Sequence, residues 1–349
     1  METVKKILFD ILPIASPSGD ETLLLNKFAS FMTSLVDDVK IDTSGNVIAH
    51  KKGNGKHKIM LIAHSDEVAL MVTYIDDKGF VYFQEVGAID TNVLPEQKVE
   101  IHHDNKIIYG VVGKKPLHLQ NKEEAAKDLK PDELWIDIGA KDKQDAETNV
   151  QVGDYITYRT DPMILSNDVV TSKSLDDKTG IVALMAVAQR LSKVKMDDDI
   201  YFVASVQEEL GGRGARTATL TIEPEIGIAL DATHATDYPS MSPVKSGNIQ
   251  VGGGVVIAKG PNINKALGSQ LFTLAKKKHL PLQIEPISHP TGTDANLVQV
   301  AGRGVKTALL SIPCRYMHTP NEVASLTDIG SMVDLLECFC QTDHSEIYL

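Results

Sequence analysis

Helical and strand-like segments alternate through most of this chain, and that alternation constrains its fold more than any other feature. From residue 176 onward, apolar residues recur at helical spacing in several ranges. These ranges are separated by short apolar runs that are typical of buried strands. The helical ranges are 178–194, 213–219, 263–279, 295–300 and 326–341, and the strand-like ranges are 200–205, 226–230, 282–286 and 307–312. Residues 1–71 add two helical segments and a continuous apolar strand over 58–63. The alternation predicts an α/β domain with a mixed sheet flanked by helices.

A segment near the middle of the chain, residues 72–163, breaks this pattern. It consists of short runs in which apolar and polar residues alternate, separated by turn sequences such as DDKG at 76–79, and it has little helical period. We therefore expect a small, barrel-like β domain inserted into the α/β domain, which then comprises residues 1–71 and 164–349. The exposed edges of so small a sheet need cover, and self-association is one way to provide it.

The composition limits the classes of partner. The 349 residues carry 35 basic and 47 acidic side chains, for a net charge of −12, so the surface offers no general attraction for nucleic acid or anionic membranes. No stretch has the length of uncharged apolar residues that a membrane span needs, and Asp10 interrupts the apolar N-terminal segment that a signal peptide would need. The three cysteines show no metal-binding spacing. We expect a cytoplasmic protein that binds neither nucleic acid nor membrane.

Side chains that bind metals in proteins gather where the predicted strands end and where one helix begins. They are His64, Asp66, Asp176, Glu208, Glu209, Asp231 and His318. Caps and turns explain any one of them, but α/β sheets bind ligands beyond the carboxyl ends of their strands. Five ligands of this kind are enough for two divalent ions that share one bridging carboxylate. Imidazole nitrogens and carboxylate oxygens are compatible with zinc, cobalt and manganese. In the adjacent pair Glu208 and Glu209, one carboxylate can bind metal while its neighbour accepts a proton from water.

Six segments of the chain resemble, in order and in spacing, the deblocking or tetrahedral aminopeptidases, which are two-metal exopeptidases similar to glutamyl aminopeptidases. The segments are LIAHSDEVALMVTYIDDKGF, SKSLDDKTGIVALM, VQEELGGRGART, ALDATHATD, HPTGTDANLV and SIPCRYMHTPNEV. The similarity runs over nearly the whole chain and includes LWIDIGAKDKQDA and VQVGDYITY in the predicted β domain. The resemblance implies a zinc-exopeptidase-like catalytic domain, an inserted dimerisation domain, and dimers that assemble into a hollow tetrahedral dodecamer.

The resemblance also implies a role for each candidate residue. His64 and Asp231 would bind one divalent ion, and Glu209 and His318 a second. Asp176 would bridge the two ions. Asp66 would orient His64, and Glu208 would be the general base. The general base activates a water that bridges the metals. The bond between Asp176 and Asp177 is expected to be a cis peptide.

The implied function is that of a metal-dependent aminopeptidase, which removes N-terminal residues from short peptides with a free amino terminus. Zinc or cobalt is favoured over manganese as its pair of ions. Two alternatives remain: a related two-metal carboxypeptidase or N-acyl amino-acid deacylase, and a non-catalytic assembly subunit on the same scaffold. The sequence leaves open the first-residue preference, the native metal, the physiological peptides and the roles of His234, His289 and Asp294.

Overall fold

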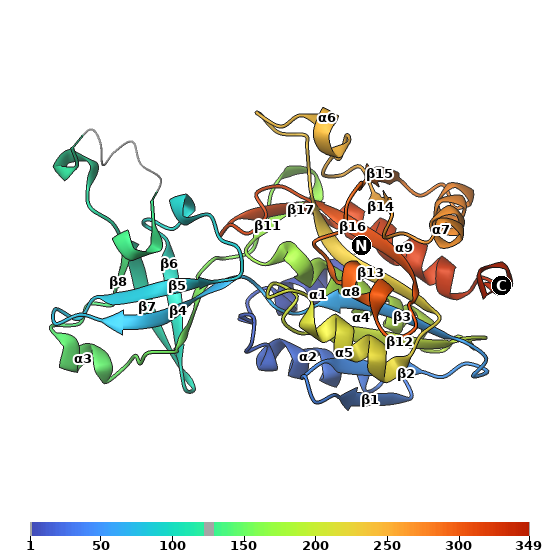
Figure 1. Ribbon diagram of the computed structural model, residues 1–349, viewed down its shortest axis with the longest axis horizontal. Coiled ribbons are helices and arrows are strands. Elements are labelled where there is room, and N and C mark those ends of the chain that lie inside the picture. Colours follow the sequence, from blue (N-terminus) through green and yellow to red (C-terminus); the bar gives the residue numbers. More distant parts are fainter. Residues whose placement is uncertain (1, 122–128, 349) are drawn as a thin grey trace.

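The computed structural model describes residues 2–121 and 129–348. It consists of an eight-stranded sheet covered by helices and, to one side of it, a closed six-stranded barrel (Figure 1). A third, small sheet is formed by β10 (Met163–Ile164), β11 (Val169–Ser172) and β17 (Glu322–Ser325). The predicted fold class, a mixed sheet flanked by helices together with a small barrel, is confirmed. No helix in the described part of the chain has the length and hydropathy needed to cross a membrane.

The large sheet is mixed, with four parallel strands at its centre. Its strands, in spatial order, are β1 (Asp38–Ile41), β2 (Val47–Lys51), β12 (Asp199–Ser205), β3 (Lys58–His64), β13 (Ile226–His234), β16 (Lys306–Cys314), β14 (Val255–Lys259) and β15 (Leu282–Pro286). The four strands β12, β3, β13 and β16 run parallel to one another, whereas β2 and β14 run antiparallel to their neighbours β12 and β16. The carboxyl ends of the four central strands therefore meet at one edge.

Helices cover both faces of this sheet because successive buried residues of each strand point to opposite faces. In β3, Ile59 and Leu61 pack on one face, and Met60 and Ile62 pack on the other. The first face is covered by α1 (Glu2–Ile11), α2 (Thr22–Met32), α4 (Leu175–Leu191), α7 (Lys265–Lys277) and α9 (Leu326–Cys340), and the second by α5 (Arg213–Ile222) and α8 (Asp294–Val300). Helix α4 is buried along nearly its whole length because it lies against the sheet as well as against α1 and α9.

The barrel is a closed antiparallel sheet with its own hydrophobic core. Its strands, in order around the barrel, are β4 (Ala69–Ile75), β5 (Val81–Val86), β8 (Trp135–Asp137), β7 (Lys106–Gly113), β6 (Lys98–His103) and β9 (Tyr155–Tyr158). The short helix α3 (Lys143–Glu147) packs beside β4, and two further short helices, α6 (Pro243–Ser246) and α10 (Ser345–Tyr348), belong to the larger body. A closed barrel has no free edge, so the expectation that this domain has exposed sheet edges is wrong.

Two differences from the predicted elements affect the site. Strand β14 was not predicted, because its five residues follow the three glycines Gly252–Gly254 and are too few to show a period. Strand β13 continues to His234, beyond the predicted end at Leu230, because it pairs with β16 as far as Cys314. Asp231 therefore lies within a strand.

Candidate metal centre

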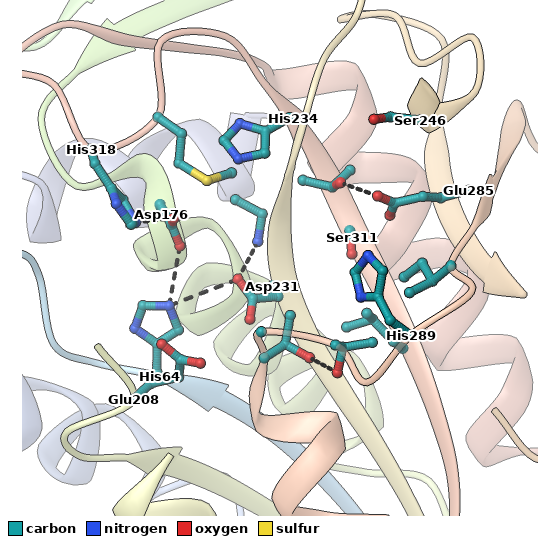
Figure 2. Close-up of a pocket in the computed structure, with 18 of the residues that line it drawn as sticks. His64, Asp176, Glu208, Asp231, His234, Ser246, Glu285, His289, Ser311 and His318 are labelled. Carbon is teal, nitrogen blue, oxygen red and sulfur yellow. Dashed lines mark hydrogen bonds and ion pairs between the residues drawn. The ribbon is translucent and has the colours of Figure 1, made fainter. Parts of the chain in front are cut away.

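The parallel centre of the sheet brings all seven candidate residues to one place. The carboxyl ends of β12, β3, β13 and β16 lie together, and Ser205 at the end of β12 is in register with His64. The residues are placed as follows: His64 ends β3 and Asp66 follows it, Glu208 and Glu209 follow β12, Asp231 lies in β13, His318 follows β16, and Asp176 lies in the first turn of α4. Figure 2 shows the side chains of His64, Asp176, Glu208, Asp231 and His318 converging.

Asp176 is at the centre of the cluster, and its two carboxylate oxygens face different histidines. Its Oδ1 lies 3.1 Å from His64 Nε2, and its Oδ2 lies 3.4 Å from His318 Nε2. The carboxylate of Asp231 approaches the same His64 nitrogen at 3.8 Å, and Glu209 Oε1 lies 3.2 Å from His318 Nε2. The donors therefore form two groups that share Asp176. The peptide bond between Asp176 and Asp177 is cis, as expected.

The surroundings of His64 fix which of its nitrogens faces the cluster. The backbone carbonyl of Asp66 lies 3.0 Å from His64 Nδ1 and can only accept a hydrogen bond. Nδ1 therefore carries the proton in the neutral imidazole, and the Nε2 lone pair points toward Asp176 and Asp231. A histidine that binds a metal through one nitrogen and donates from the other has this arrangement.

The carboxylate of Asp66 connects the segment that follows β3 with the segment that follows β12. The backbone amides of Glu208 and Glu209 donate to its two oxygens, at 2.9 and 3.1 Å, and its Oδ1 lies 3.5 Å from His64 Nδ1. Burial raises the pKa of Asp66, but the hydrogen bond and charge of His64 outweigh this and hold that pKa below its usual range. Asp66 thus positions both His64 and the Glu208–Glu209 pair.

The two adjacent glutamates have different surroundings. Glu209 pairs with His318, whereas the Glu208 carboxylate has no hydrogen-bond partner among the described residues and lines the cavity beside His64 (Figure 2). Burial, with further contributions from Asp294 and Glu209, raises the pKa of Glu208 to about 9. Burial and the charge of Asp176 likewise raise the pKa of Asp231.

The donor set and its charge fit divalent cations. The ligand atoms of His64, Asp176 and Glu209 lie within 4.8 Å of one another, and no lysine or arginine is among the described residues that line the cavity. A divalent ion would stabilise the ionised form of the buried carboxylates and lower their pKa. Imidazole nitrogen together with carboxylate oxygen suits zinc, cobalt and manganese.

Glu322 belongs to this centre and was not singled out from the sequence. Its two carboxylate oxygens accept hydrogen bonds from the backbone amides of Asp176, at 3.0 Å, and of His318, at 2.8 Å. It is buried, and burial together with the charge of Asp176 raises its pKa to about 8. Its position four residues after His318, within the same recognised segment, was the available signal.

The three residues whose roles the sequence leaves open lie at or behind the same site. His234 and His289 line the cavity next to the candidate metal centre (Figure 2). This cavity has a volume of about 430 Å³. Asp294 is buried in the first turn of α8 and accepts a hydrogen bond of 2.6 Å from Ser205. It therefore supports the end of β12, from which Glu208 and Glu209 follow.

Comparisons with known proteins find relatives that match nearly the whole chain. A family model described as M42 glutamyl aminopeptidase matches residues 45–335. The lysyl aminopeptidase of Pyrococcus furiosus is 38% identical over 348 residues, which cover 97% of this chain and 96% of that protein. A putative aminopeptidase of Acetivibrio thermocellus is 37% identical over 345 residues, covering 95% of this chain and 98% of that protein.

A solved structure shares the whole fold. It is a TET1 peptidase of Pyrococcus horikoshii, described as able to assemble into a tetrahedron or a large octahedral shell, and it superposes with a TM-score of 0.87 at 29% identity, over 97% of this chain and 99% of that one. The region matched by the family model includes every residue of the candidate metal centre, from His64 to Glu322. The family resemblance inferred from the sequence is thus confirmed: the chain belongs to the M42 glutamyl aminopeptidase family and is a peptide hydrolase of the aminopeptidase type.

Proposed function

We propose that this chain is a two-metal aminopeptidase that removes the first residue of short peptides with a free amino terminus. The observation that carries the proposal is the position of Asp176, whose two oxygens face His64 and His318, beside a Glu208 carboxylate that has no partner among the described residues. In this arrangement Asp176 and the two histidines are available to bind metal, and Glu208 is free to accept a proton. Hydrolysis by two metals requires both kinds of group.

The donor groups define which residues would hold each ion. His64 and Asp231 with Oδ1 of Asp176 would hold one, and Glu209 and His318 with Oδ2 of Asp176 would hold the other. When bound, the pair of ions would supply Lewis acidity, which polarises the scissile carbonyl and makes water a better acid. Zinc or cobalt is proposed first, and the same ligands accommodate manganese.

Glu208 carries out the proton transfers. Its carboxylate takes a proton from the water that attacks the first peptide carbonyl, and then gives this proton to the leaving nitrogen as the C–N bond breaks. Asp66 holds the backbone of Glu208 through the amide hydrogen bond of 2.9 Å.

A panel of aminoacyl chromogenic substrates tests this function. We expect the apo-enzyme to hydrolyse free-amine substrates after reloading with zinc, cobalt or manganese, and to leave the N-acetylated forms of the same substrates intact. Preference for the acetylated forms would instead identify the related deacylase. Cleavage only at the carboxyl end of peptides would identify a carboxypeptidase, and a metal-loaded protein inactive on all of these would be an assembly subunit.

We further propose that the chain forms dimers through the barrel and a dodecamer from these dimers. Three alternate residues of β7, Ile107, Tyr109 and Val111, point outward and are about half exposed, at 49%, 56% and 46%. An apolar stripe of this kind on the outside of a closed barrel is typical of an interface between subunits. The Pyrococcus horikoshii structure, described as a tetrahedron or an octahedral shell, also supports assembly.

Replacing Tyr109 by glutamate is expected to lower the particle mass measured by light scattering, because a charge would be buried at the contact. Tyr74→Glu is the matched control, since Tyr74 of β4 is similarly exposed at 53% but is not next to β7. A wild-type particle of 38.0 kDa would contradict any assembly. If Tyr74→Glu dissociates the particle and Tyr109→Glu does not, the contact between subunits lies at β4 and not at β7.

A further inference from the structure

The cavity next to the metal centre holds one carboxylate that the proposed chemistry does not use. Glu285, in the edge strand β15, lines this cavity together with the metal ligands. The hydroxyl of Thr233 donates to its Oε1 at 2.8 Å. Within the described ranges, no other hydrogen bond to the Glu285 carboxylate is formed, and no lysine, arginine or histidine makes an ion pair with it. Figure 2 shows it on the side of the cavity away from His64 and Glu208.

The position of Glu285 relative to the metal centre is set by β13. Asp231 and Thr233 are two residues apart in this strand, so their side chains leave the same face about 6.6 Å apart. Asp231 belongs to the metal centre and Thr233 holds Glu285. The side chain of lysine spans about 6 Å from Cα to Nζ at ordinary bond lengths. A first residue held at the metal centre by its backbone can therefore place a lysine ammonium near Glu285.

The lining of the cavity favours a positive side chain. Pro286, Ile287 and Leu309 provide apolar walls for its methylene groups. Partial desolvation lowers the pKa of His234, which disfavours a positive charge on this imidazole, and none of the described residues that line the cavity is a lysine or arginine. Burial also raises the pKa of Glu285, and a cation brought next to this carboxylate would stabilise its ionised form.

We propose that Glu285 determines first-residue specificity by forming an ion pair with a basic side chain, so that peptides beginning with lysine or arginine are the preferred substrates. This inference rests on the proposed aminopeptidase function. Glu285 acts on the side chain of the first residue and takes no part in bond cleavage.

The test compares lysyl and leucyl chromogenic substrates in the metal-loaded wild type, in Glu285→Gln and in Glu223→Gln. Wild type is expected to prefer the lysyl substrate, and Glu285→Gln to reduce the ratio of the two kcat/KM values about 10- to 100-fold, as for loss of a hydrogen bond to a charged group. Glu223 is the matched control, because it is exposed and lies before the start of β13, at the end away from the cavity. Its replacement should leave the ratio unchanged.

Calorimetric binding of free L-lysine and L-norleucine provides a readout that does not need turnover. The two ligands differ at the ammonium, so wild type should bind lysine more tightly and Glu285→Gln should bind both alike. A wild type without lysyl preference, or a ratio that Glu285→Gln leaves unchanged, would overturn the assignment of Glu285. If no free-amine substrate is hydrolysed but the binding difference depends on Glu285, the proposed function and the substrate preference fail, and only the recognition of a basic side chain by Glu285 stands.

Discussion

Replacing Glu208 by glutamine is expected to lower kcat by about 10²–10⁴ while the protein keeps two divalent ions per chain. Glutamine has the size and shape of glutamate, but it cannot accept the proton of the attacking water. The Glu208 carboxylate makes no hydrogen bond within the described residues, whereas its backbone amide donates to Asp66, and the substitution preserves that amide. Metal analysis and kcat, measured on the same samples, check the prediction.

Glu209→Gln is the matched control, because Glu209 is the next residue and has the same side chain. Its carboxylate lies 3.2 Å from His318 Nε2, so we expect this variant to bind the second ion weakly and to recover part of its activity at high metal concentration. The two variants must therefore differ. Metal loss in Glu208→Gln with full occupancy in an inactive Glu209→Gln would reverse the two roles, and full activity in both would refute the mechanism.

Replacing Glu67 by glutamine is expected to reduce the free energy of unfolding by about 3–5 kcal/mol, the usual cost of breaking a buried ion pair on one side. Both oxygens of the buried Glu67 accept hydrogen bonds from Lys173 Nζ, at 2.7 and 2.6 Å. Oε1 also accepts from the amide of Ser16 and lies 3.5 Å from Lys178 Nζ. The substitution would leave two buried ammonium groups without their carboxylate.

The measurement is urea unfolding near pH 7 at one protein concentration, since assembly adds a concentration dependence. Burial raises the pKa of Glu67, but Lys173 and Lys178 outweigh it and lower this pKa from 4.5 to about 2. The contribution of Glu67 is therefore complete above pH 4.5 and is lost as the pH falls toward 2. Glu337→Gln is the control, because Glu337 forms an exposed pair with Arg190 and should cost less than about 1 kcal/mol. Equal effects in both variants would show that the buried network gives no net stability.

Local pattern in the sequence predicts most of the secondary structure. The strand expected over 282–286 coincides with β15, and the helix expected over 326–341 differs from α9 by one residue. These elements are long enough, or bounded clearly enough by glycine and proline, to show their period. Strand β14 was missed because its identity depends on pairing with β16 and β15, and a short apolar run does not specify its partners.

The residue types of the metal centre are also readable from the sequence. Histidines and carboxylates follow predicted strands, and parallel strands bring such positions to one edge. The sequence alone does not say that the two oxygens of Asp176 would face His64 and His318, which are 112 and 142 residues away from it. Nor does it separate Glu208, which has no described partner, from its neighbour Glu209.

The sequence by itself therefore determined the fold class, the family and the residue types of the candidate metal centre. The tertiary structure alone decided that Glu322 holds the backbones of Asp176 and His318, and that Glu285 enters the cavity beside the metal centre. The physical reason is that periodicity and capping act over a few residues, whereas strand order and the pairing of buried polar groups depend on contacts between distant segments. Glu285 reaches the site because β15 is next to β14 in the sheet and Thr233 of β13 donates to it, and no local pattern encodes that neighbourhood.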